Sequence, residues 1–107
     1  MKRIASVIGL APENRDEYEA YHAAVWPEVL QTITACNIRN YSIFRYGDLL
    51  FSYYEYVGDD YAADMAKMAE DPATQKWWAV QEPLQTRLPG TPEHEQWLPI
   101  AEVFHHD

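Results

Sequence analysis

Cysteine is almost missing from this chain of 107 residues, which contains only Cys36. A single cysteine cannot form an intramolecular disulfide, and this pattern is typical of proteins from a reducing compartment. No activating base stands near Cys36 in the sequence, so we interpret it as a structural thiol. The cysteine content therefore indicates a reducing compartment.

Basic residues are also scarce, with 8 lysines and arginines against 17 acidic residues and a net charge of -9. Nucleic acids and anionic membranes repel such a surface, so neither is an expected partner. No apolar run reaches membrane-spanning length. The apolar residues 4–10 follow Lys2 and Arg3 as in a signal peptide, but the run is short, and we interpret it as a first strand.

The sequence lacks a nucleophile motif, a glycine-rich phosphate loop and a Cys-x-x-Cys pair. The adjacent His105 and His106 have no carboxylate or cysteine partners at ligand spacing, so we predict no metal site.

What the chain does have is 48% hydrophobic and 14% aromatic residues, which indicates a globular protein. Its length predicts one domain over residues 1–107, too small to bury a large core unaided.

Strand and helix signals alternate along the chain. Short β-branched runs bounded by proline or glycine predict strands, and capped amphipathic stretches predict helices. The expected elements are a strand over 4–10, helices over 15–25 and 28–35, a hairpin of strands over 38–46 and 49–57, a helix over 61–70, a short helix with Trp77 and Trp78, a loop over 82–99 and a strand over 100–104.

This β-α-β-β-α-β order predicts an α+β protein with the ferredoxin-like fold, an antiparallel sheet with helices on one face. The hairpin strands carry aromatic residues at both odd and even positions, and these point to opposite faces of the sheet. The second face should therefore also be covered or line a pocket. We therefore expect a homodimer of the dimeric α/β barrel type, packed through the sheets, with the C-terminal segment crossing to the partner.

One group of candidate site residues lies on the first helix. Tyr18 and His22 are four residues apart and share a helix face, which Trp26 continues. Imidazole titrates near neutral pH, so His22 is the best-placed acid or base, with His105 and His106 as alternatives. The same spacing also fits a core-facing aromatic stripe with one hydrogen-bonded histidine.

A second group is the pair Trp77 and Trp78. Neighbouring helical residues diverge by at least a quarter turn, so one indole can line a cavity while the other packs in the core. Indole faces suit the C–H face of a sugar ring, and the indole N–H can donate a hydrogen bond. Two core anchors are the alternative interpretation.

Together these residues resemble the L-rhamnose mutarotase family in order and spacing. The match covers nearly the whole chain and comprises Tyr18-x-x-x-His22-x-x-Val25-Trp26-Pro27-Glu28, Asn40-Tyr41-Ser42-Ile43, Trp77-Trp78 and Glu102-Val103-Phe104-His105. The resemblance implies a cytoplasmic, homodimeric isomerase that uses no cofactor and no metal. It implies that His22 is the catalytic proton donor and that Tyr18, Tyr41, Trp77 and Trp78 contact the sugar substrate.

Mutarotation opens a pyranose at C1 and closes it on the other face, which requires proton transfer but no nucleophile or redox centre. On the resemblance we expect interconversion of the α and β anomers of a 6-deoxy sugar, with L-rhamnose preferred and L-fucose the closest competitor. Two residues depart from the family pattern, Tyr21 before His22 and Trp97 in the 82–99 loop. A dimeric α/β-barrel monooxygenase and a non-catalytic sugar-binding dimer are the alternatives, because fold alone does not decide function.

Overall fold

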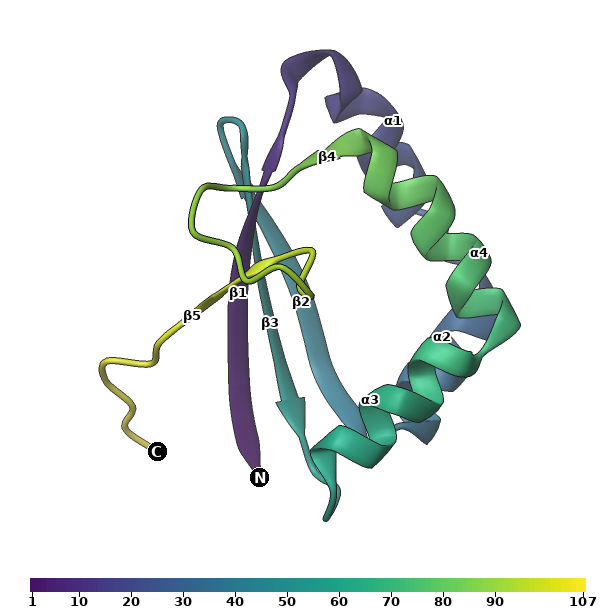
Figure 1. Ribbon diagram of the computed structural model, residues 1–107, viewed down its shortest axis with the longest axis vertical. Coiled ribbons are helices and arrows are strands. Elements are labelled where there is room, and N and C mark those ends of the chain that lie inside the picture. The colour runs from purple at the N-terminus through teal and green to yellow at the C-terminus, as the bar shows by residue number, and fades with distance from the viewer.

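The computed structural model describes residues 1–107 as one sheet with all helices on one side (Figure 1). The strands are β1 (Lys2–Leu10), β2 (Ile38–Tyr46), β3 (Leu49–Tyr56), β4 (Gln85–Thr86) and β5 (Leu98–Ile100). The helices are α1 (Arg15–His22), α2 (Pro27–Ala35), α3 (Tyr61–Glu70) and α4 (Pro72–Gln81), with 3-10 turns η1 (Pro12–Asn14) and η2 (Glu82–Leu84). None of the helices has the length and apolar character needed to cross a membrane.

The sheet is antiparallel and its strand order is β2-β3-β1-β4, with β5 also paired to β1. One edge of β1 is paired with β3 along its length, so the two short strands share the other edge. Strand β4 pairs with Gly9 and Leu10, and strand β5 pairs with residues 5–7. The two short strands thus act as a single interrupted fourth strand. This arrangement confirms the predicted α+β, ferredoxin-like order of elements.

Three predicted boundaries were wrong. Helix α1 ends at His22 and not near Val25, because Pro27 keeps Trp26 extended, at φ -60 and ψ 132. The expected 82–99 loop contains η2 and β4. The last strand is Leu98–Ile100 and not 100–104, and residues 101–107 form no ladder with the sheet.

The core lies between the sheet and the helices. Alternation along the strands points Ile8, Leu10 and Leu50 toward the helices, where they pack with Tyr18 of α1 and Leu84 of η2. Tyr21, Ile43 and Trp97 pack around this cluster. The core therefore holds α1 against the sheet and fixes the position of Tyr18.

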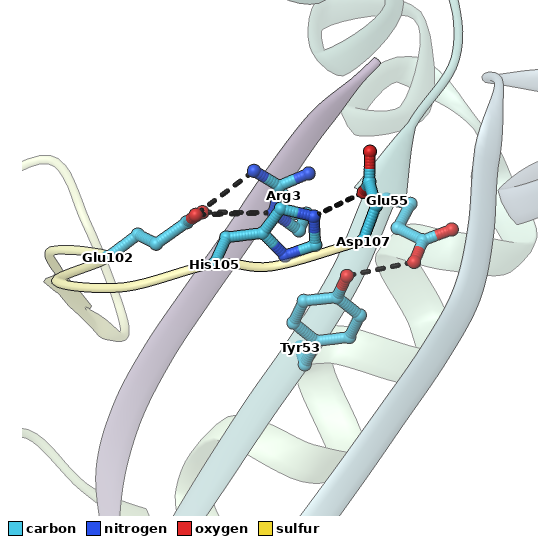
Figure 2. Close-up of polar contacts among 6 residues, drawn as sticks. All are labelled: Arg3, Tyr53, Glu55, Glu102, His105 and Asp107. Carbon is cyan, nitrogen blue, oxygen red and sulfur yellow. Dashed lines mark hydrogen bonds and ion pairs between the residues drawn. The ribbon is translucent and has the colours of Figure 1, made fainter.

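The opposite face of the sheet is open. Phe44 is 65% exposed and Tyr46 is 79% exposed on β2. Residues 101–107 leave β5 on this side, and Glu102 accepts two hydrogen bonds of 3.0 Å from the Arg3 guanidinium of β1 (Figure 2). His105 lies over the same face, and its Nε2 is 2.7 Å from the Oδ1 of Asp107. Apart from this C-terminal segment, the second face lacks a cover within this chain.

Candidate active site

Helix α1 presents a phenol and an imidazole side by side. The Tyr18 and His22 rings are stacked, with centroids 4.1 Å apart and planes 23° apart, as their four-residue spacing predicts. Tyr18 is buried in the core, whereas His22 is half-buried. The core therefore anchors one ring and leaves the other ring able to meet a ligand.

The hydrogen bond at His22 fixes the state of its ring. Nδ1 lies 2.8 Å from the carbonyl oxygen of Tyr18. A carbonyl only accepts, so Nδ1 carries the hydrogen and Nε2 holds the lone pair in the neutral ring. Burial lowers the pKa of His22, partly offset by this hydrogen bond. At neutral pH the free ring nitrogen is therefore a proton acceptor.

Helix α4 closes the aromatic cluster with Trp77. This indole is 7% exposed, and its ring lies edge-on to Tyr21, His22 and Trp26 at centroid distances of 6.0, 5.3 and 5.0 Å. Trp26 thus joins the cluster although it lies outside α1. Trp78 is 37% exposed and makes no ring contact within the chain. The two indoles differ as their helical positions require.

Tyr41 lies on β2 within an irregular stretch where the β2–β3 register shifts between Arg39 and Ser42. Its ring is 5.3 Å from the Tyr54 ring, and the Tyr54 hydroxyl bonds that of Tyr61. Tyr41 is 44% exposed, and the burial of the rest of its phenol raises its pKa to about 12. Burial likewise raises the pKa of Tyr18 and of Tyr54. These phenols stay protonated and act as hydrogen-bond donors.

A cleft of about 320 Å³ lies between α1 and the hairpin strands. Its walls are Tyr18, Glu19, His22, Ala23, Ile43, Phe44, Arg45 and Leu50. Arg45 and Glu19 form an ion pair of 3.4 Å there. The volume lies at the low end of small-molecule sites, about 300 Å³ and upward, which suits a monosaccharide. A hollow of about 440 Å³ on α2, lined by Leu30, Gln31, Thr34 and Ala35, has no acid or base.

The other histidines lie away from this cleft. His94 is exposed in the segment between β4 and β5, and His105 lies on the open face of the sheet (Figure 2). No group of three or more histidine, cysteine, aspartate or glutamate side chains is placed to hold a metal ion. His22 is therefore the one histidine among the cleft-lining residues.

Several polar residues near the site were missed by the sequence reasoning. Tyr54 and Tyr61 could have been found, because alternation along β3 places Tyr54 on the helix-facing side with Ile8 and Leu50. Gln85 and Gln81 carry no such signal. The direction of the Gln85 side chain is set by β4, and this stretch was expected to be loop. The Gln81 amide is buried and has no hydrogen-bond partner within the chain.

Fold and site together define a small α+β protein with a histidine-lined cleft the size of a small-molecule site. A family model described as L-rhamnose mutarotase matches residues 3–106. The chain belongs to the L-rhamnose mutarotase family.

Several similar proteins cover the chain almost completely. An L-rhamnose mutarotase from Listeria monocytogenes serotype 4b (strain F2365) is 38% identical over 107 residues, or 98% of each chain. An L-fucose mutarotase from Xanthomonas campestris is 36% identical, covering 97% of this chain and 87% of its own length. The crystal structure of an L-rhamnose mutarotase from Formosa agariphila matches with a TM-score of 0.77 at 24% identity and full coverage of both chains, which supports the fold.

Proposed function

We propose that this protein interconverts the α and β anomers of a 6-deoxy sugar, with L-rhamnose as the preferred substrate. The observation that carries the proposal is the His22 ring, which lines the cleft with its Nδ1 tied to a backbone carbonyl. Nε2 of the same ring forms no hydrogen bond within the chain. Family membership supports the same reaction class.

Ring opening requires loss of the proton on the anomeric oxygen and gain of a proton by the ring oxygen. Both oxygens are bonded to C1, so one imidazole nitrogen can reach each in turn. Neutral His22 accepts the anomeric proton at Nε2, and the C1–O bond of the ring breaks as the imidazolium returns that proton to the ring oxygen. Rotation about C1–C2 and the reverse steps give the other anomer, with no net proton change.

In this scheme His22 is both the base and the predicted proton donor. A proton transfer by a positioned side chain contributes about 10²- to 10⁴-fold to a rate. The raised pKa values of Tyr18 and Tyr41 leave both hydroxyls protonated and suited to donate to sugar oxygens. Of the two indoles predicted to contact the sugar, Trp78 has the exposed surface that can meet the C–H face of the ring, whereas Trp77 packs in the aromatic cluster beside His22.

The preference for a 6-deoxy sugar follows from the apolar walls. A methyl at C5 fits beside Ile43 and Leu50 better than a hydroxymethyl does. A hydrophobic pocket rejects an added hydroxyl by only about a hundredfold, so hexoses should be slow rather than inert. L-Rhamnose and L-fucose differ in hydroxyl configuration, which only hydrogen bonds can read, and one similar protein is named an L-fucose mutarotase.

We also propose that the protein is a homodimer that packs through the open sheet face. Phe44 and Tyr46 on that face, and Val103 and Phe104 on the extended C-terminal segment, are all exposed. Such an interface should bury about 1,200 Å² or more, with residues 101–107 reaching the partner. A cytoplasmic location is part of the same proposal, because Cys36 is a free, buried thiol.

Saturation-transfer NMR of the anomeric protons tests the proposal. L-Rhamnose, L-fucose and D-glucose, at equal concentrations with the same amount of enzyme, should exchange fastest for L-rhamnose and slowest for glucose. Faster exchange of L-fucose would overturn the substrate assignment, and no enhancement for any sugar would overturn the reaction.

A further inference from the structure

The segment between β4 and β5 is tied to β4 by a pair of glutamines. Gln96, near the end of this segment, donates from its Nε2 to the Oε1 of Gln85 on β4, at 3.3 Å. This hydrogen bond occupies the acceptor of the Gln85 amide. The Nε2 of Gln85, a donor, is therefore left to face elsewhere.

Strand pairing directs the Gln85 side chain toward Tyr18. Gln85 stands opposite Leu10 in the β1–β4 ladder, and directly opposed residues point to the same face of a sheet. Leu10 packs against Tyr18 in the core, together with Leu84, which precedes Gln85. The Gln85 amide also counteracts part of the rise in the pKa of Tyr18, as a donor to the phenol oxygen does.

Gln96 itself is held between two anchors. The Arg87 guanidinium donates to the carbonyl oxygens of Glu95 at 3.1 Å and Pro92 at 2.8 Å, which fixes the backbone on one side of Gln96. Trp97, on the other side, packs against the core cluster. The donor at Gln96 is thus fixed in place.

From this geometry we infer that Gln85 and Gln96 are positioning residues that set which way the Tyr18 hydroxyl donates. Gln96 donates to Gln85. In the inferred arrangement the remaining Gln85 donor, on the sheet face that Leu10 shares with Tyr18, turns to the Tyr18 oxygen, so the hydroxyl hydrogen of Tyr18 is left for the sugar. This inference rests on the proposed function and assigns to the β4–β5 segment a role in orienting a substrate-binding group.

Reversing the polarity of the chain of hydrogen bonds tests the inference. In Gln96→Glu the carboxylate can only accept, so the Gln85 amide turns and its oxygen takes the Tyr18 hydrogen away from the sugar. We expect kcat/KM for L-rhamnose to fall about two- to tenfold, the range for one neutral hydrogen bond. Gln96→Lys keeps a donor at this position and should remain near wild type.

The same substitutions in a Tyr18→Phe background separate positioning from structure. Without the hydroxyl, Gln96→Glu should change kcat/KM by less than about twofold, because interacting residues lose their coupling when one partner is removed. An equal loss in both backgrounds, or a loss in Gln96→Lys as large as in Gln96→Glu, would overturn the inference. Calorimetry of L-rhamnose binding to the same variants measures the coupling between residue 96 and Tyr18 without catalysis. The inference can therefore be tested even if the protein does not exchange anomers.

Discussion

Truncating each of the two adjacent tryptophans should give opposite results. Trp77 is 7% exposed and contacts three aromatic rings, whereas Trp78 is 37% exposed and contacts none. Replacing a buried tryptophan by alanine costs about 3–5 kcal/mol in the free energy of unfolding. We expect Trp77→Ala to show this loss.

The loss is large relative to the stability of a small domain, about 5–15 kcal/mol in total. Trp77→Phe keeps one aromatic ring beside His22 and should therefore lose less of the free energy of unfolding than Trp77→Ala. Trp78→Ala should cost about 1 kcal/mol or less, near the usual effect of a surface substitution, and should raise the KM for L-rhamnose, because its free surface is available to the sugar.

Urea unfolding followed by far-UV circular dichroism measures these effects without relying on tryptophan emission. All variants must be compared at one protein concentration, since association would shift the midpoint. An equal stability loss in Trp78→Ala and Trp77→Ala, or an unchanged KM in Trp78→Ala, would refute the division between a packing indole and a ligand-facing one.

Three further predictions concern other parts of the molecule. The rate of anomer exchange should stay level through neutral pH and fall in acid, because protonation of His22 removes the base. The pKa of His22 in the folded protein lies below the unfolded value of about 6.5, so the free energy of unfolding should also fall as the pH drops below that value. A pH profile that declines above neutrality would contradict this. Gln81→Met should raise the urea midpoint by removing a buried amide without a partner, worth about 1 kcal/mol, and a lower midpoint would show that the amide is paired. Phe44→Glu on the open face should yield monomers in sedimentation, with Gln75→Glu on the exposed side of α4 as the control; a wild-type monomer at micromolar concentration would refute the dimer.

Much of the fold could be predicted because the sequence carries its own boundaries. Pro12, the Gly47-Asp48 turn and the Asp71-Pro72 break mark ends that the structure confirms. The errors fall where long-range contacts decide. Residues 85–86 become strand only because the end of β1 offers an unpaired edge, and the final strand is displaced toward Leu98 for the same reason.

The site shows a similar division. The stacking of Tyr18 on His22 follows from helical spacing, and so does the divergence of Trp77 and Trp78. The chemical state of His22 could not be predicted, because it depends on burial and on a hydrogen bond to a backbone carbonyl. The part played by Gln85 requires knowledge of its strand partner.

Anomer exchange by His22 variants tests the central claim most directly. Saturation-transfer NMR on L-rhamnose should show rapid exchange with the wild-type protein and a loss of about 10²-fold or more with folded His22→Ala. Near-normal exchange by a folded His22→Ala variant would contradict the claim and leave His22 as a packing residue of the aromatic cluster.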